Sequence, residues 1–399
     1  MNCDLIHSSM ETACKVSSQV APKMKYPDDW KVYTLNKLVE QTQYGTNQAV
    51  STDGFIPIIG MKEIQNGKVL IAAQKVSLSP GEQEKYRLDD GDILLNRTNS
   101  LDLVGKSGVY HQNTNAVFAS YLIRLKPVKS LADSDYLGYY LNSYPAYITL
   151  KKIATAAISQ ANINPTELKR LMVIPCPSLP EQRRIAEFLG TWDKAIKKLE
   201  QLIAAKEKQQ KVLSNHIFDQ VKKQEFQQCR LVNICAIHKG VQLGKFEMNA
   251  KGRYPVLNGG ISYSGYTDSY NCEANTIAIS EGGNSCGFVN LIREKFWCGG
   301  HCYTLKNIRI SMQYLFFFLK HRQDMLMNLR VGSGLPNIQK KDLENVEVVF
   351  PIMEEEQNRF SEILLCTQNE LDLLRKKLAA LQKQKRGLMQ KLLTGTWRV

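Results

Sequence analysis

Apolar residues recur at alternating steps of four and three along two long segments of the chain. This is the 3.5-residue period of a coiled-coil seam, and each run of about 35 residues corresponds to ~50 Å of helix. Every position of the first run has a counterpart 175 positions later. The predicted seam positions are Ile185, Leu189, Trp192, Ile196, Leu199, Ile203, Lys206, Gln210, Leu213 and Ile217 in the first helix, and Phe360, Leu364, Thr367, Leu371, Leu374, Leu378, Leu381, Lys385, Leu388 and Leu392 in the second.

The two predicted helices share more than their period. The seam is interrupted by a polar residue at the same place in both, Gln210 in one and Lys385 in the other. A strand-like run with proline, followed by Glu-Gln, precedes each helix, with Gln182 and Gln357 at equivalent positions. Each helix therefore follows its own globular segment.

The globular segments also repeat. Matched positions lie at offsets that fall steadily along the chain: Leu35 with Leu231 at 196, Gly105 with Gly287 at 182, Leu125 with Leu305 at 180, Tyr136 with Tyr314 at 178, and Ile163 with Ile338 at 175. Two homologous domains that differ in loop length produce such an ordered series. The alternative is one large domain with two unrelated helices.

Short alternating or continuous apolar runs with Gly and Asp at their ends predict short strands in both segments. We therefore expect an α+β fold with two tandem-repeated β-rich domains and two long helices packed as an antiparallel coiled coil. The predicted boundaries are a disordered leader at 1–25, a first domain at 26–178, a first helix at 179–223, a second domain at 224–353 and a second helix at 354–399.

The chain carries a net charge of +14, spread over loops, helices and the C-terminal region. Such an excess favours a polyanionic partner, because neutralising phosphates releases counterions. No run of 18 apolar residues occurs, and the first residues lack the pattern of a secretory signal. We expect a cytoplasmic protein that does not bind membranes.

Motifs for catalysis and metal binding are incomplete. Cys298, His301 and Cys302 lie close in sequence, but a second pair of ligands with zinc spacing is missing, so reduced thiols are the favoured interpretation over zinc. The run Leu103 to Ser107 resembles the end of a phosphate-binding loop, yet Ser100 stands where that loop needs glycine. Methyltransferase and nuclease motifs are also missing. We expect no catalytic residue, no metal and no cofactor bound by this chain.

Polar side chains in the predicted loops are of the types that read DNA bases. Arg and Lys donate to guanine O6 and N7, and Asn or Gln pair with adenine N6 and N7. For any single residue the alternative is a solvated turn, and for Gln160, Asn162 and Asn337 it is a helix N-terminal cap. The candidate DNA-binding residues are Arg97, Asn99, Lys106, Gln160, Asn162, Arg253, Asn258, Asn284, Asn337 and Lys340.

Two signatures carry a resemblance to a known family. The segment from Pro177 to Ile185 leads into the first helix as Pro-Ser-Leu-Pro-Glu-Gln-Arg-Arg-Ile, and Leu392 to Gly395 ends the second as Leu-Leu-Thr-Gly. With the tandem repeat, they make residues 26–399 resemble the specificity subunit of type I restriction-modification enzymes. The second helix departs from the pattern, since Glu354-Glu355 replaces Leu-Pro, and the first helix ends without Leu-Thr-Gly.

The resemblance implies two target-recognition domains, each reading one half of a split sequence in double-stranded DNA. It implies that the helices set the spacing between half-sites and dock two modification subunits, with Arg183, Arg184, Lys194 and Lys198 on one helix and Arg375, Lys376, Lys377 and Arg386 on the other as candidate docking charges. The modification subunits would bind S-adenosylmethionine, and translocating restriction subunits would use ATP and Mg²⁺.

Two alternatives remain open from the sequence. A coiled-coil scaffold whose β-rich domains bind proteins would show the same repeat and helices, without needing the basic excess. A DNA-reading subunit that serves methylation alone would carry the same motifs as one that also serves restriction.

Overall fold

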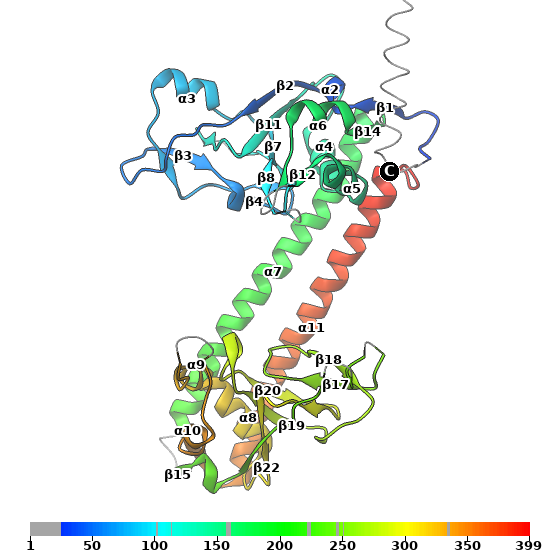
Figure 1. The fold of residues 1–399 in the computed structure, drawn as a ribbon. Coiled ribbons are helices and arrows are strands. Elements are labelled where there is room, and N and C mark those ends of the chain that lie inside the picture. Colours follow the sequence, from blue (N-terminus) through cyan, green and yellow to red (C-terminus); the bar gives the residue numbers. More distant parts are fainter. Residues whose placement is uncertain are drawn as a thin grey trace, which may run out of the picture. The chain divides into compact units, whose positions relative to one another are not determined.

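The computed structural model describes residues 25–100, 103–112, 114–156, 161–221, 225–244, 247–249, 251–332 and 336–399. The predicted leader therefore lies almost wholly outside the described residues. The chain divides into two compact units, Met1–Lys198 with Ala379–Val399 as unit 1, and Leu199–Leu378 as unit 2. The division cuts both long helices, α7 (Leu179–Val221) and α11 (Glu354–Leu393), so each unit holds one β-rich domain and a segment of each helix (Figure 1).

The remaining elements of unit 1 are short strands and helices. In chain order they are β1 (Lys31–Thr34), α2 (Leu35–Leu38), β2 (Val39–Tyr44), β3 (Ile56–Ile59), η1 (Met61–Glu63), β4 (Ile64–Gln65), β5 (Lys68–Val69), β6 (Lys75–Val76), α3 (Pro80–Tyr86), β7 (Ile93–Asn96), β8 (Thr98–Asn99), β9 (Ser107–Val109), β10 (Val117–Phe118), β11 (Leu122–Pro127), α4 (Ser134–Leu141), α5 (Tyr144–Ile153), β12 (Thr155–Ala156), β13 (Ala161–Asn162), α6 (Pro165–Leu171) and β14 (Val173–Cys176).

Unit 2 has the same kinds of element in a similar order. They are β15 (Phe226–Arg230), η2 (Leu231–Asn233), β16 (Ala236–Lys239), β17 (Tyr254–Leu257), β18 (Gly265–Thr267), β19 (Thr276–Ser280), η4 (Gly283–Ser285), β20 (Val289–Ile292), β21 (Trp297–Cys298), β22 (Cys302–Lys306), α8 (Met312–His321), α9 (Gln323–Asn328), α10 (Lys340–Glu344) and β23 (Glu347–Pro351).

The central sheets of the two units have the same strand order and register. Unit 1 contains the sequence of neighbours β2-β11-β7-β9, and unit 2 contains β16-β22-β19-β20, all antiparallel. Ile123 of β11 lies opposite Leu95 and Tyr44 in unit 1. Tyr303 of β22 lies opposite Ile279 and Lys239 in unit 2. The repeat predicted from the falling offsets is thus present strand by strand.

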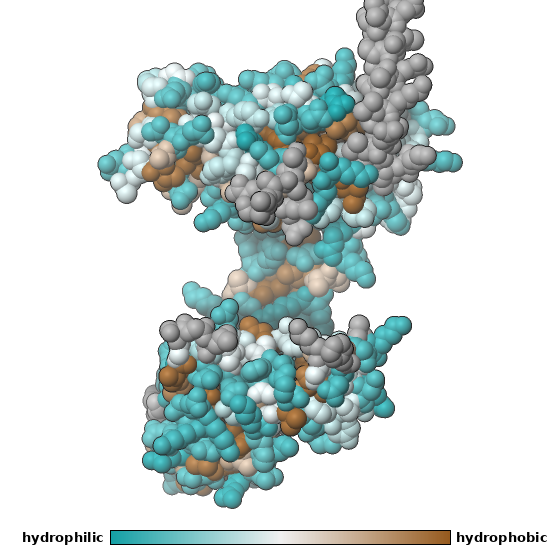
Figure 2. All heavy atoms as spheres, in the orientation of Figure 1, coloured by the Kyte–Doolittle hydropathy of each residue, from teal (hydrophilic) through white to brown (hydrophobic). Residues whose placement is uncertain are grey.

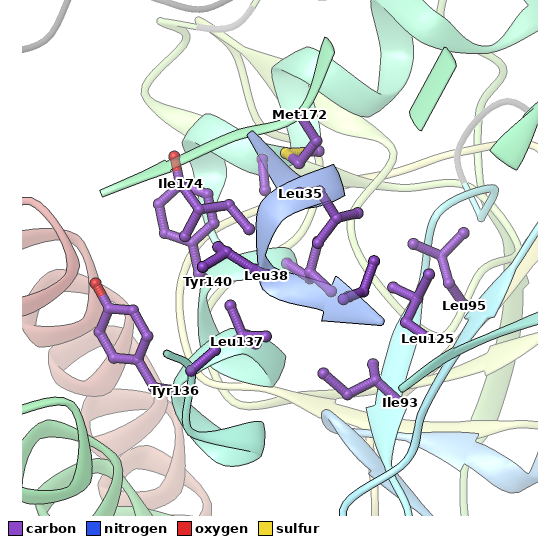
Figure 3. Packing of buried hydrophobic residues seen from close by; sticks show 14 of the residues in the cluster. Leu35, Leu38, Ile93, Leu95, Leu125, Tyr136, Leu137, Tyr140, Met172 and Ile174 are labelled. Carbon is purple, nitrogen blue, oxygen red and sulfur yellow. The ribbon is translucent and has the colours of Figure 1, made fainter. Parts of the chain in front are cut away.

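The core of unit 1 lies between this sheet and the helices packed on it. Figure 3 shows Leu35 and Leu38 of α2, Tyr136 and Tyr140 of α4, and strand residues such as Ile93 converging on one apolar interior. β7 is buried at all four positions because both of its faces are covered, which explains its continuous apolar run. Unit 2 has an equivalent core around β19, β22 and α8.

Each long helix begins with a buried glutamine that binds backbone. Gln182 Oε1 accepts the N–H of Asp133, the N-cap of α4, at 2.9 Å, and its amide donates to Pro177 O at 3.0 Å. Gln357 Oε1 accepts the N–H of Ser311, the N-cap of α8, at 2.8 Å. The repeated Glu-Gln signature therefore fixes the junction between the long helix and the preceding domain.

The segments of α7 and α11 pack antiparallel within each unit. In unit 2, Gln210 Nε2 donates to Thr367 Oγ1 and Gln368 Oε1, both at 3.2 Å, and Lys206 pairs with Glu370. In unit 1, Lys385 pairs with Asp193. The predicted seam residues are all buried or half-buried. Asp193–Lys385 and Gln368–Gln210 are equivalent under the 175-residue offset, so the polar layer repeats with different chemistry.

These observations confirm the predicted fold class of two β-rich repeats with two long helices. In the described part of the chain, no helix is long and apolar enough to span a membrane. The same residues hold no cluster of three or more His, Cys, Asp or Glu side chains placed to bind a metal ion. Cys298 and Cys302 are buried free thiols, at the end of β21 and the start of β22.

Candidate nucleic-acid interface

The loop that follows β7 carries the best-defined candidates of unit 1. Its ends are closed by backbone hydrogen bonds from Asn96 N to Lys106 O at 2.8 Å and from Gly105 N to Asn96 O at 2.7 Å. Gly105 has φ +85°, and a Cβ there would lie 2.9 Å from Leu150 Cδ1, so glycine is required. Ile163, the residue after β13, adds a third bond from its N–H to Arg97 O at 2.9 Å.

Arg97 is held in a defined place at the end of β7. Its Nε donates to Asn162 Oδ1 at 3.3 Å, and its guanidinium lies over the ring of Tyr44, 4.5 Å from the centroid. Thr98 Oγ1 also donates to Asn162 Oδ1, at 3.4 Å. The structure therefore brings the predicted residues Arg97 and Asn162 together, although they are 65 positions apart.

Two further candidates of unit 1, Asn99 and Lys106, lie on the same loop as Arg97. Asn99 Nδ2 lies 3.4 Å from Met61 Sδ, and Lys106 is exposed at the far end of the same loop. Asn162 is part of β13 and does not cap a helix; Asn164 is the N-cap of α6, accepting from Thr166 N at 2.8 Å. The capping alternative for Asn162 is therefore wrong. Gln160 lies outside the described residues.

Unit 2 builds the same loop frame after β19. Gly287 N donates to Ser280 O at 2.8 Å, Ser280 N donates to Phe288 O at 3.0 Å, and Ile338 N donates to Glu281 O at 2.9 Å. Gly287 has φ +83°, and a Cβ there would lie 2.7 Å from Met327 N. Each of these bonds has a counterpart in unit 1, so Glu281 occupies the position of Arg97.

A polar cluster surrounds Glu281. Its Oε1 accepts from Lys239 Nζ at 2.7 Å and from the hydroxyl of Tyr303 at 3.0 Å, while its Oε2 lies 4.0 Å from His301 Nδ1. The Glu281 side chain is only 10% exposed, whereas those of Lys239 and His301 are 55% and 64% exposed. The buried carboxylate thus binds the accessible ammonium of Lys239 and lies near the accessible imidazole of His301.

The predicted residues of unit 2 gather only in part around this cluster. Asn258 Oδ1 accepts from His301 N at 3.3 Å, and Asn337 forms a β-bridge with Gly282, next to the exposed Asn284. Gln339, not Asn337, is the N-cap of α10, so the capping alternative for Asn337 is also wrong.

Two predicted residues of unit 2 have other surroundings. Arg253 is exposed, with its guanidinium 5.4 Å from the centroid of the Tyr254 ring, in the small sheet of β17, β18 and β21. Lys340 begins α10 and pairs with Glu344 at 3.6 Å.

Tyr44, Lys239, Tyr303 and Glu281 were not among the candidate DNA-binding residues predicted from sequence, and His301 was considered there only as a metal ligand. Tyr44 and Lys239 sit on β2 and β16, far from the loops in sequence, and their place beside the loops depends on strand order. A signal was nevertheless present, because their offset of 195 falls next to the offset of 196 for Leu35 and Leu231.

The chemistry of these surfaces suits a duplex with charged backbone and polar base edges. Guanidinium, ammonium and amide groups can bind phosphates or base edges, and exposed aromatic rings can contact bases. Figure 2 shows hydrophilic residues over most of the visible face of each unit, with hydrophobic residues in small patches. Among the candidate docking charges, Arg184 donates to Val399 O and Arg375 pairs with Glu207, so both are engaged within the chain.

Comparison with known proteins extends this account. The chain matches the model of the type I restriction modification DNA specificity domain over residues 27–207 and again over residues 223–383. It is 26% identical to a proposed specificity subunit of the type I restriction enzyme MjaX from Methanocaldococcus jannaschii, over 94% of this chain and 95% of that one. It is 32% identical to a proposed type I specificity subunit of Mycoplasma genitalium, over 35% of this chain and 37% of that one.

Solved structures give the same result for the fold. The S subunit of a type I restriction-modification system from M. genitalium matches with a TM-score of 0.65 and 19% identity, covering 93% of this chain and 98% of that one. At this identity the likeness concerns the fold alone. The domain model matches twice and covers most of the chain, so the protein belongs to the family of type I restriction-modification specificity subunits and contains two recognition domains.

Proposed function

We propose that the chain is the sequence-reading, non-catalytic subunit of a type I restriction-modification complex, with each unit reading one half of a split DNA target. The observation that carries this proposal is the repeated loop frame. The same backbone bonds fix Arg97 in unit 1 and Glu281 in unit 2. Arg97 is itself a donor suited to base edges, and Glu281 binds such a donor, Lys239. The net charge of +14 supports a nucleic-acid partner.

The long helices are proposed to set half-site spacing and to dock two modification subunits. Their surfaces carry exposed large apolar side chains, including Phe188 on α7 in unit 1 and Leu373 on α11 in unit 2. In this proposal a modification subunit covers these side chains when it docks. Arg183 and Lys194 of α7 line a cavity of about 550 Å³ in unit 1, together with Glu187 and Gly190 of the same helix.

In this proposal the modification and restriction subunits, not this chain, carry out the catalytic steps of the complex. The modification subunits bind S-adenosylmethionine and extract the target adenine from the duplex. The restriction subunits use ATP and Mg²⁺. The contribution of this chain is to position that machinery on one sequence.

Selection of bound DNA tests the proposal. The complex of the chain with its modification subunit is incubated with random duplexes, and the retained DNA is sequenced. Two short blocks separated by a gap of constant length and random sequence are expected, with affinity that falls steeply as salt rises. Retention of duplexes without any shared motif by a folded complex contradicts the proposal and supports a protein-binding scaffold.

A further inference from the structure

Each central sheet brings one residue of its edge strand beside the loop of the candidate interface, and the two residues occupy equivalent positions in the two units. In unit 1, Tyr44 lies opposite Ile123, which lies opposite Leu95, two residues before Arg97. In unit 2, Lys239 lies opposite Tyr303, which lies opposite Ile279, two residues before Glu281. Tyr44 therefore corresponds to Lys239, and Arg97 to Glu281.

The positively charged residue stands at a different position in each of the two units. In unit 1 the cation is on the loop after β7 and lies over an aromatic ring, with Arg97 4.5 Å from the centroid of Tyr44. In unit 2 the cation is Lys239 on β16, and an acid stands on the loop, with 2.7 Å between Lys239 Nζ and Glu281 Oε1. The same place on the sheet thus presents a planar fork in one unit and a single ammonium in the other.

The surroundings restrain each cation differently. Arg97 uses Nε for Asn162, and within the described residues its two terminal NH₂ groups make no other hydrogen bond, so they form a pair of donors in the plane of a guanidinium that lies over Tyr44. Such a fork matches O6 and N7 of guanine. Lys239 is a point donor, held by a carboxylate that Tyr303 also binds, and it suits a single acceptor on a base edge.

Resting on the proposed function, we propose that these pairs determine specificity: Arg97 selects guanine at one position of the unit 1 half-site, and Lys239, positioned by Glu281, selects an acceptor-bearing base at the matching position of the unit 2 half-site. The two half-sites are then read by different groups at this position, because the cation lies on the loop after β7 in unit 1 and on β16 in unit 2.

The test uses the selection of bound duplexes with matched variants. Arg97→Ala and Arg97→Lys are compared, because lysine keeps the charge and loses the fork. Arg97→Ala is expected to lose the guanine preference at one position of one half-site, with affinity for the wild-type target falling roughly 5- to 150-fold. Arg97→Lys is expected to weaken the same preference, because the ammonium can still donate to guanine but lacks the planar pair of donors. The other half-site should be unchanged. Lys239→Ala should relax one position of the opposite half-site in the same way.

Two further variants separate base readout from other roles. Lys106→Ala removes an exposed cation from the Arg97 loop and is expected to weaken binding evenly across sequences, as a phosphate contact does. Glu281→Gln keeps a hydrogen-bonding side chain in place. It should relax the same position as Lys239→Ala while leaving thermal unfolding near the wild type and strengthening binding to random DNA, because a negative charge is removed.

The outcomes are distinct. Even weakening by Arg97→Ala with both half-sites intact assigns Arg97 to phosphate and overturns the inference. Wild-type selectivity in Arg97→Lys overturns the role of the fork, and an unchanged motif in both Lys239→Ala and Glu281→Gln overturns the unit 2 assignment. Failure of the wild-type complex to select any split motif overturns the proposed function itself, before the variants are compared.

Discussion

Buried amide side chains perform the same task in both units. Gln182 and Gln357 are 1% and 3% exposed, and each accepts the N–H of an N-cap residue and donates to a proline carbonyl. Sequence analysis found both glutamines as a repeated signature, because they lie beside the local helix pattern. It could not find their bonds, because Gln182 meets Asp133 across 49 positions of chain.

Replacing either glutamine with alanine should loosen its own unit. Gln182→Ala and Gln357→Ala each leave a buried N–H and a buried carbonyl unpaired, at a cost of about 3 kcal/mol. Hydrogen exchange should accelerate in α4 for the first variant and in α8 for the second. Gln209→Ala, at an exposed position of α7, is the control and should exchange like the wild type. Equal protection in all three variants would show that the bonds are dispensable.

A histidine of unit 1 makes its stability depend on pH. His111 lies between Asp135, 3.1 Å away, and Asp90, 2.9 Å away. Hydrogen bonds to Asp135 and then Asp90, opposed by partial burial, raise the pKa of His111 to about 9. Because the folded pKa exceeds the unfolded value, the stabilisation is complete below pH ~6.5 and is lost as pH rises through about 9.

The variant His111→Gln isolates this effect. The wild type should melt at a higher temperature than His111→Gln at pH 6, and the difference should vanish by pH 10. Solvent screens the half-exposed imidazole, so the expected difference is no more than about 1 kcal/mol. A difference that stays constant from pH 6 to pH 10 contradicts the assignment.

At the scale of elements, the helices were the most predictable part of the fold. Their seam follows from a local period of 3.5 residues, and every predicted seam position is buried or half-buried. The sheets were less predictable. Short strands could be located, but β11 joins β2 and β7 through residues about 80 and 28 positions away, such as Arg124 with Gln43. Strand pairing over such separations in the chain does not produce a local sequence pattern, so the strand order could not be predicted.

The polar residues between α7 and α11 can be tested by replacing the charged pair of unit 1 with the glutamine pair of unit 2. Asp193 and Lys385 are largely buried, and Asp193 also accepts from the hydroxyl of Tyr139 at 2.6 Å. Asp193→Gln removes the counter-ion of Lys385 and should destabilise unit 1 by about 3 kcal/mol. Adding Lys385→Gln recreates the amide pair found at the equivalent position, Gln210 with Gln368, and should recover most of the loss.

Chemical denaturation followed by a double-mutant cycle measures this coupling. The control is Lys194→Gln, an exposed position next to the layer, which should change stability by less than about 0.5 kcal/mol. A double variant whose loss equals the sum of the two single losses would show that the charges do not interact.

At the scale of the whole molecule, the falling offsets between matched residues predicted the tandem repeat of the two units. The structure adds Tyr44 with Lys239 at 195 and Arg97 with Glu281 at 184, and both fit between the offsets found in sequence. Sequence therefore revealed the repeat, whereas the paired side chains that differ between the copies emerged only from the register of the sheets.

An insertion in the long helices tests the proposal that they set the spacing between the two half-sites. One added turn in both α7 and α11 lengthens the pair by ~5.4 Å, which corresponds to roughly one to two base pairs of DNA. The gap between half-sites should lengthen while both half-site sequences stay the same. The same number of residues inserted at Ala49, in the exposed loop between β2 and β3, serves as the control and should leave the gap unchanged. An unchanged gap between half-sites in the helix variant contradicts the proposal that the helices set this spacing.

The most direct test of the central claim is a map of adenine methylation by single-molecule sequencing. DNA is taken from cells that express this chain with its modification subunit and from cells that express the modification subunit alone. A split motif methylated on both strands, present only with the chain, is the predicted result. Identical methylation in the two cultures, with the complex folded and assembled, would contradict the claim that this chain reads the sequence.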